Sequence, residues 1–192
     1  KDALALRKAN IGVSMGKRKT QVAQEAADII LEDDNFETIT TAVREGRIIT
    51  DNIKNFVIYL LSCNISEILL VFFASLLGMP LPILPLQILF LNVVTDIFPA
   101  FALTAGEGTK GIMTRSPRDP DKPIITKKHW FTLGMYGLGL TLTVLGTLSI
   151  ALNILRFSQA RAVTISFLTL AFVQLWHVLN MRNFGKNLKK NE

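Results

Sequence analysis

The chain has 192 residues, of which 49% are hydrophobic, and its formal net charge is +6. A mean hydropathy of +0.37 is too apolar for an ordinary soluble domain, and the apolar residues form long runs. The single cysteine, Cys63, excludes an intrachain disulfide. The basic residues flank the apolar runs, which is typical of membrane topology and argues against a nucleic-acid partner.

The first 34 residues predict a small α/β layer. Ala9–Met15 is typical of a short buried strand, Thr20–Ala27 of a short helix and Asp28–Leu31 of a second strand. Strands that alternate with a helix indicate a parallel sheet. Two strands and one helix are too few to bury a hydrophobic core by themselves. We therefore expect residues 1–34 to be the end of a larger cytoplasmic domain.

A long helix is predicted next, with Asp34 as its N-cap and Glu37 as the capping-box partner. The amphipathic stretch 35–55 runs without a proline into the apolar stretch 56–79. Read as one helix of about 44 residues, it is ~66 Å long and forms a stalk that continues across the membrane. The alternative is two helices, with a break near Gly46 or Asp51.

Four apolar runs have the length of transmembrane helices, since about 20 residues cross the hydrocarbon core. They are Phe56–Met79, Ile83–Thr104, Trp130–Asn153 and Ala162–Met181. Lysine and arginine are concentrated before the first run, in the loop 105–129 and in the tail 182–192. Because cytoplasmic segments carry this excess, we expect a multi-pass membrane protein with both termini of the chain in the cytoplasm.

Polar residues lie within the first two apolar runs. Glu67 and Asp96 are equally far from the turn near Leu81, so both carboxyl groups are expected ~22 Å from that turn, near the middle of the membrane. Asn64 shares a helix face with Glu67. A second face carries Asn92, Thr95 and Asp96, at positions i, i+3 and i+4.

This set of oxygen ligands predicts a cation site. Carboxylates within a membrane mark ion or proton paths, and carboxylate, amide and hydroxyl oxygens suit hard cations such as Ca²⁺. Gln174 on the fourth run adds a further amide oxygen. Pro85 and Pro99 are expected to loosen the second helix and to free backbone carbonyls as ligands. The alternative is that these groups only join helices through hydrogen bonds, with Glu67 protonated.

Two further features in the membrane predict packing contacts. Gly139, Thr143 and Thr147 form a stripe of small residues on the third run, which is typical of a contact between helices. His177 lies one turn after Gln174, and we interpret it as a packing residue.

The sequence resembles a known family over essentially its whole length. "KDALALRKANIGVSMG…VAQEAADIILEDDNFETITTAVREGRIITDNIKNF" resembles the end of the phosphorylation domain and the stalk of P-type cation-transporting ATPases, especially the calcium-pump-like branch. "NISEILL" and "LNVVTDIFPAFAL" are similar to that branch's fifth and sixth membrane helices. "IMTRSPRDPDKPII" is similar to the loop that follows them, and "TLAFVQLWHVLNMRNF" to the eighth helix.

The resemblance assigns roles to particular residues. The implied cation ligands are Asn64, Glu67, Asn92, Thr95 and Asp96, whereas Gln174 stands where some calcium pumps have a glutamate. That departure favours one transported ion over two, and Asn92 favours calcium over sodium, with manganese as a further alternative. Asp2 matches the last aspartate of the hinge motif beside the phosphorylation site and its Mg²⁺. Lys1 stands where that motif has asparagine.

The resemblance implies a mainly α polytopic membrane protein with four transmembrane helices. A remnant of a haloacid-dehalogenase-like phosphorylation domain (1–34) and a stalk helix (35–55) precede the membrane domain (56–181) and a tail (182–192). The intact pump would use ATP and Mg²⁺ and would supply its amino-terminal domains as partners.

No DKTGT-like motif occurs in these 192 residues. The chain is therefore interpreted as part of an ATP-driven pump in the lipid bilayer. The alternative is a catalytically inactive remnant that acts as a passive or regulatory subunit. An independent channel is disfavoured, because four helices with one polar hairpin make a poor pore.

Overall fold

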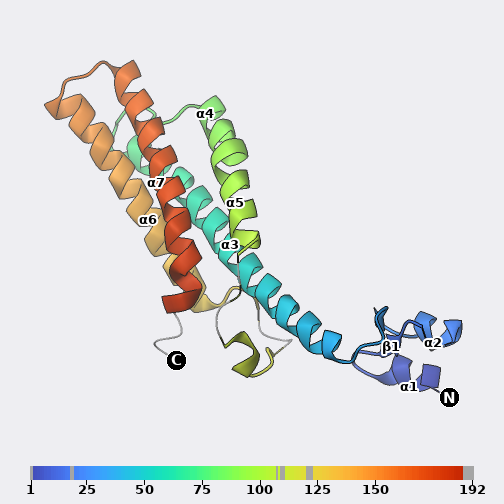
Figure 1. The fold of residues 1–192 in the computed structure, drawn as a ribbon. Helices are drawn as coiled ribbons and strands as arrows, with labels where there is room; N and C mark the ends of the chain where they lie inside the picture. Colours follow the sequence, from blue (N-terminus) through green and yellow to red (C-terminus); the bar gives the residue numbers. More distant parts are fainter. Residues whose placement is uncertain (1, 18–19, 107, 109–110, 120–122, 188–192) are drawn as a thin grey trace. The chain divides into compact units, whose positions relative to one another are not determined.

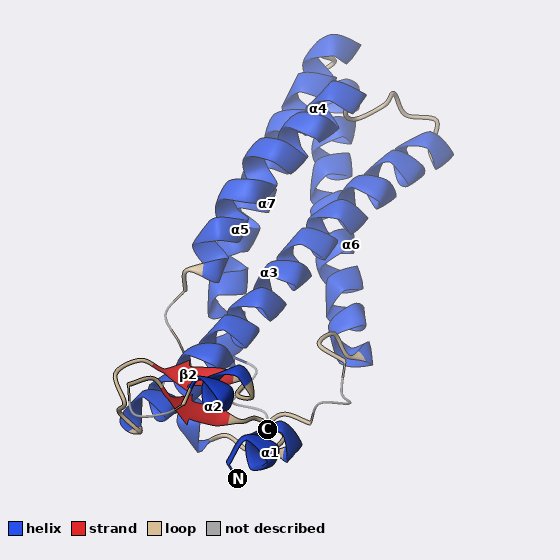
Figure 2. Ribbon diagram, turned by 90° about the vertical axis from the view of Figure 1, so that its right-hand side faces the viewer, coloured by secondary structure: helices blue, strands red, loops and turns tan. Residues whose placement is uncertain are grey.

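A computed structural model describes residues 2–17, 20–106, 108, 111–119 and 123–187, without the side chains of Asp2 and of residues 182–187. The chain divides into two compact units, residues 1–47 and 48–192, which are described separately below. Figure 1 gives the course of the chain and Figure 2 its secondary structure. Lys1 lies outside the described residues, as does the side chain of Asp2, so the roles predicted for both stay predictions.

The first unit contains the expected small α/β layer, with shorter elements. Helix α1 (Asp2–Lys8) is followed by strand β1 (Val13–Met15), helix α2 (Gln21–Glu25) and strand β2 (Ile29–Leu31). The two strands, red in Figure 2, pair in parallel with Val13 opposite Ile29. The sequence prediction missed α1 and began the first strand at Ala9, because the apolar residues before Val13 resemble a strand start.

A close approach between α1 and β1 requires glycine at position 12. A Cβ atom there would lie 2.7 Å from the carbonyl oxygen of Leu6. The Gly12 N–H donates a hydrogen bond to Oδ2 of Asp28 at 2.8 Å, which ties the starts of the two strands together. Gly12 therefore fixes the parallel register of this small sheet.

The predicted cap of the long helix is wrong. Asp34 has a φ of 53°, in the left-handed region, and its carboxylate accepts a hydrogen bond from the Lys17 N–H at 3.0 Å. Helix α3 begins at Glu37, and Asn35 Oδ1 accepts the Glu37 N–H at 3.0 Å. The sequence could not show whether Asp34 or Asn35 caps the helix, because both residue types are good helix caps.

Asp33 supports the same helix start. Hydrogen bonds from the Thr38 hydroxyl and the Asn35 N–H lower the pKa of the Asp33 carboxyl below its usual value. A carboxyl group with a lowered pKa stabilises the folded form above its unfolded pKa, and that contribution is lost as the pH falls through the folded value. We therefore expect the start of α3 to weaken only in acid.

Helix α3 (Glu37–Leu76) is one continuous helix of 40 residues. The single long helix expected from the sequence is confirmed, and α3 has no break at Gly46 or Asp51. It ends at Leu76, three residues earlier than predicted. Gly78 adopts a left-handed φ of 65°, and the Met79 N–H bonds to the Ala74 carbonyl at 2.9 Å, an arrangement that closes helix ends.

The other predicted membrane helices are also present. The second consists of α4 (Pro85–Phe90), a π-helical segment η1 (Leu91–Asp96) and α5 (Ile97–Thr104). A short 3₁₀ turn, η2 (Ile112–Thr114), lies in the following loop. The third is α6 (Lys127–Ser149), continued by the π-helical η3 (Ile150–Ile154), and the fourth is α7 (Gln159–Asn187). Within the described residues, four helices are long and apolar enough to cross a membrane. The chain is thus mainly α-helical and multi-pass.

The membrane helices pack through three apolar clusters. One joins Leu70 on α3 to Leu91, Val144 and Leu170, and a second joins Tyr59 and Cys63 on α3 to Leu103 and Met181. The third lies where η3 meets the start of α7. Helices α6 and α7, orange to red in Figure 1, lie against each other along their length.

The small-residue contact on α6 involves different residues from those predicted. Gly139 has open space around it and Thr143 is exposed. The contact with α3 is made instead by Gly137, which packs against Ile65, and by Thr141, whose hydroxyl donates to the Ser66 carbonyl at 3.1 Å. Both stripes have the same spacing, so the sequence could not select between them.

A matched pair of substitutions tests this packing. A Cβ at Gly137 would lie 2.7 Å from Cγ2 of Ile65, whereas one at Gly139 would meet nothing within 4 Å. We expect Gly137→Ala to destabilise the protein by ~1–3 kcal/mol through overpacking. Gly139→Ala should be neutral or stabilising, because alanine favours helices. Thermal unfolding of the purified protein in detergent compares the two, and equal midpoints would contradict the α3–α6 contact.

Candidate ion-binding site

The backbone of the second membrane helix is loosened next to Asp96. The segment Leu91–Asp96 is π-helical, and Pro99 follows Thr95 by four residues. Because proline has no N–H, the Thr95 carbonyl cannot receive the usual helical hydrogen bond. The hydroxyl of Tyr59 on α3 donates to this carbonyl at 3.0 Å. The loosening expected from Pro99 is therefore present, and the freed carbonyl is bound by Tyr59.

Glu67 lies buried between α3 and α7. Its side chain is 5% exposed, and its Oε1 accepts a hydrogen bond from Nε2 of Gln174 at 3.0 Å. Gln174 itself is completely buried. Burial of a carboxylate costs free energy unless a partner compensates its charge. The donor to Glu67 among the described residues is the neutral amide of Gln174. This contact therefore supplies no positive charge to Glu67.

Two buried acceptor oxygens in the same region have no hydrogen-bond donor among the described residues. They are Oδ1 of Asp96 and Oε1 of Gln174. Asp96 is only 3% exposed, and Glu67 is the other buried carboxyl group of the membrane helices among the described residues. Unpaired acceptors are expensive to bury, and a cation is the ligand that would satisfy both oxygens and both charges.

The two asparagines lie on a different side of Asp96. Asn64, Asn92 and Asp96 line a groove of about 630 Å³, whose other walls are Phe56, Leu60, Ile97, Ala100, Phe101 and Thr104. Asn64 is exposed, and its Nδ2 donates to the Leu60 carbonyl at 2.9 Å. Asp96 and the two asparagines are thus polar residues in a mostly apolar groove, whose lining does not include Glu67 or Gln174.

Thr95 faces away from the groove. Its side chain is buried, and its hydroxyl donates to the Leu91 carbonyl at 2.6 Å. The six predicted membrane residues therefore do not form one closed shell: Asn64, Asn92 and Asp96 line the groove, whereas Gln174 contacts Glu67. Among the described residues, no three His, Cys, Asp or Glu side chains come together. Since Ca²⁺ takes six to eight oxygens, a complete site would need ligands from outside this chain.

Sequence reasoning missed Tyr59, whereas it predicted a packing role for His177. The Ser62 hydroxyl donates to the Tyr59 carbonyl at 2.8 Å, so its oxygen accepts the hydrogen bond from Nε2 of His177 at 2.9 Å. The imidazole also stacks on the ring of Tyr59 and contacts the ring of Tyr136 at a tilt of 56°. His177 is a packing residue, as predicted. Pro99 is the feature of the sequence that could have indicated the role of Tyr59. A carbonyl that proline leaves without its helical hydrogen bond needs a donor from a neighbouring helix.

Comparison with known proteins places these helices in a family. The family model described as "Cation transporting ATPase, C-terminus" matches residues 80–192. A calcium-transporting ATPase of Bacillus subtilis is 42% identical over 190 residues, which is 99% of this chain and 21% of that protein.

Two other relatives match a shorter part. A probable cation-transporting ATPase F of Mycobacterium tuberculosis is 50% identical over 125 residues, 65% of this chain and 14% of that protein. The endoplasmic reticulum calcium ATPase srcA of Aspergillus fumigatus is 49% identical over 124 residues, 65% of this chain and 13% of that protein. The chain thus spans about a fifth or less of the length of these relatives. It belongs to the calcium-pump-like branch of the P-type cation-transporting ATPases and corresponds to part of their carboxy-terminal region.

Proposed function

We propose that this chain supplies membrane-embedded ligands for Ca²⁺ in an ATP-driven pump. The observation that carries the proposal is a pair of buried acceptor oxygens, on Asp96 and Gln174, that have no donor among the described residues. Gln174 also contacts the carboxyl group of Glu67. Two of the relatives are named as calcium ATPases, which supports calcium over sodium or manganese as the transported ion. The groove beside Asp96 leaves room for ligands from another part of the pump.

A single transported Ca²⁺ is the second element of the proposal. Gln174 contributes an oxygen without a charge, so this chain offers two carboxylates, Glu67 and Asp96, for one divalent cation. A second Ca²⁺ beside the first would add two positive charges in a region of low dielectric constant, with no further carboxylate from this chain to balance them.

The remaining roles follow from the family. ATP and Mg²⁺ would act at the aspartyl-phosphate site, to which this chain contributes Asp2, while the other pump domains supply the nucleotide site. Helix α3 would carry the movement that accompanies phosphorylation toward the ion ligands, because it is one unbroken helix of 40 residues. The concentration of basic residues in the loop 105–129 and in the tail 182–192 supports a cytoplasmic location for both termini.

A chimeric pump tests the proposal. Residues 1–192 replace the matching 190 residues of the Bacillus subtilis relative, and membrane vesicles that contain the chimera are tested for ATP-driven uptake of radioactive Ca²⁺. We expect uptake with one Ca²⁺ per ATP hydrolysed. A folded chimera that takes up no calcium would contradict the proposal and favour the inactive-remnant alternative. Uptake of sodium or manganese instead would correct the ion.

A further inference from the structure

The start of helix α6 is capped by a histidine side chain. Thr126 is the N-cap, and its carbonyl accepts hydrogen bonds from the N–H groups of His129 at 2.9 Å and Trp130 at 3.1 Å. The N–H of Thr126 donates in turn to Nδ1 of His129 at 3.0 Å. The Thr126 hydroxyl lies 2.9 Å from the same nitrogen. The side chain of His129 therefore ties the residue before the helix to its first turn.

His129 occupies a position at which glutamate or glutamine is usual. In a capping box, the side chain of the third helical residue accepts the N–H of the N-cap residue through a carboxylate or amide oxygen. An imidazole nitrogen accepts a hydrogen bond only while it carries no proton. Because Nδ1 accepts the Thr126 N–H, the ring is neutral and has its proton on Nε2. The cap of α6 consequently depends on the protonation state of one ring.

The surroundings of His129 oppose a positive charge on this ring. His129 is 8% exposed and directly precedes the apolar run that begins at Trp130. Burial, the Lys54 ammonium on α3 and the neighbouring Lys128 lower the pKa of the His129 imidazole below its usual value. The positive end of the helix dipole acts in the same direction. A protonated ring would therefore lose its contact with Thr126 and would also be repelled by two ammonium groups.

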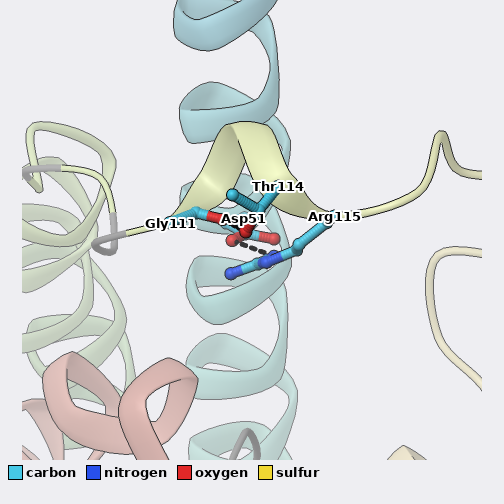
Figure 3. Close-up of polar contacts among 4 residues, drawn as sticks. All are labelled: Asp51, Gly111, Thr114 and Arg115. Carbon is cyan, nitrogen blue, oxygen red and sulfur yellow. Dashed lines mark hydrogen bonds and ion pairs between the residues drawn. The ribbon is translucent and has the colours of Figure 1, made fainter.

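The carboxylate of α3 that lies three residues before Lys54 binds an arginine. Oδ2 of Asp51 accepts a hydrogen bond from the Arg115 guanidinium at 2.8 Å, and Figure 3 shows the two side chains in contact. This ion pair lies at the other end of the segment that leads from η2 to α6. Protonation of His129 would therefore free the junction at Thr126 without freeing the loop at Arg115.

The first turn of α6 leads directly into the apolar packing of the helix. Leu133, one turn after His129, is completely buried and belongs to the cluster that contains Ile58 of α3. Ile125, which precedes Thr126, packs against the same cluster. The cap thus lies between two residues that attach α6 and its preceding loop to α3. Loss of the cap would loosen the first turn and the support that it gives to Leu133.

We propose that His129 is a pH-sensitive cap of α6: the neutral ring holds Thr126 and the first helical turn, and protonation of the ring releases them when the cytoplasm becomes acid. The release follows from the contacts of His129 alone. A resulting fall in calcium transport rests, in addition, on the function proposed above. The two effects can be measured separately.

The cap is expected to be lost on the acid side. A group whose pKa is lower in the folded protein stabilises the fold above its unfolded pKa, which is about 6.5 for histidine. That contribution is lost as the pH falls through the folded value. The cap should therefore be complete at about pH 7.5 and lost at a pH below the ordinary histidine range.

Amide hydrogen exchange at residues 126–133 of the purified 192-residue protein measures the release. His129→Gln keeps an acceptor at every pH, whereas His129→Ala removes it. At about pH 7.5 we expect the wild type and His129→Gln to exchange equally. At about pH 5 the wild type should exchange about fivefold faster than His129→Gln, the factor that corresponds to one hydrogen bond. His129→Ala should exchange faster by the same factor at both pH values.

Comparison at the same pH isolates His129. The pH dependence of the exchange chemistry is then common to all three proteins, and so is the other histidine of the chain, His177. Residues 159–166 at the start of α7 are the internal control and should respond to pH alike in all three. If the wild type and His129→Gln respond alike at residues 126–133 as well, the pH-sensitive cap is refuted.

Nitrogen-15 NMR of the imidazole rings gives a readout that a merely structural role would not move. The signals of His129 are those that are absent from His129→Gln. We expect Nδ1 to be unprotonated at about pH 7.5 and to gain a proton over the pH interval in which exchange at residues 126–133 rises. A ring that already carries a proton on Nδ1 at about pH 7.5 would contradict the cap.

Calcium uptake by the chimeric pump tests the effect on transport. In vesicles whose cytoplasmic side faces outward, we expect acidification of the medium to reduce uptake by up to about fivefold more in the unmodified chimera than in His129→Gln. An equal reduction in both refutes the effect on transport and leaves the cap to the exchange measurement. If the unmodified chimera takes up no calcium at any pH, the proposed function fails, and exchange and NMR still decide whether His129 is the cap.

Discussion

Asp96→Asn is expected to abolish calcium-dependent phosphorylation from ATP in the chimeric pump, with at least a ~100-fold loss of calcium affinity. Asparagine has nearly the same shape, so the change removes one negative charge and leaves the packing intact. Asp96 has the largest expected effect because its Oδ1 is buried without a donor among the described residues and because its side chain lines the groove. Phosphorylation with radioactive ATP over a range of calcium concentrations is the measurement.

A control separates loss of the ion from loss of the fold. Thr143→Val removes an exposed hydroxyl, which bonds only to the Gly139 carbonyl of its own helix at 2.9 Å, and it should behave as the wild type. Asp96→Asn should match this control in expression level and thermal unfolding. An unchanged calcium affinity in a folded Asp96→Asn pump would remove Asp96 from the site.

Gln174→Ala is expected to lower calcium affinity by about 10- to 100-fold, the range for losing a hydrogen bond to a charged group. The amide is the described donor to Glu67, and its free Oε1 is one of the two unpaired acceptors. Alanine would remove both at once. Calcium dependence of phosphorylation measures the loss, and equilibrium binding of radioactive calcium gives the number of bound ions.

Ser166→Ala provides the matched control on the same helix. Ser166 is buried on α7, and its hydroxyl donates to the carbonyl of Ala162 within that helix at 3.0 Å. Its removal should leave calcium binding unchanged. If Gln174→Ala binds calcium as tightly as Ser166→Ala does, Gln174 is a packing residue, which was the alternative interpretation from the sequence.

Much of the fold could be predicted because the membrane imposes simple rules. Four apolar runs became four helices, and the absence of proline between Asn35 and Met79 correctly indicated one long helix. The errors concern the ends of α3, where neighbouring residues are similarly suited to cap or end the helix. Asp34 and Asn35 are equivalent caps in sequence, and Gly78 ended α3 earlier than hydropathy suggested.

The candidate site was predictable only as a list of residue types. Helix periodicity placed Glu67 and Asp96 at similar depths, and the structure buries both side chains. Periodicity could not show that Gln174 donates to Glu67, since that contact joins residues 107 positions apart. Nor could it show that Asn64 is exposed on the groove, or that Tyr59 binds the carbonyl of Thr95. Such contacts depend on how the helices rotate about their axes.

Within the described part of the second unit, residues of helix α3 make polar contacts with several later segments. The contacts join Asp51 to Arg115, Asn52 to Thr104 and Gly106, Tyr59 to Thr95, Ser62 to His177, Ser66 to Thr141 and Glu67 to Gln174. One residue inserted into α3 between Asn52 and Tyr59 would rotate the later partners by about 100° and shift them by about 1.5 Å relative to the earlier ones. The length of this stretch is consequently as constrained as its composition, and an engineered pump can tolerate insertions in the turn after Gly78 far better than within the stretch Asp51–Glu67.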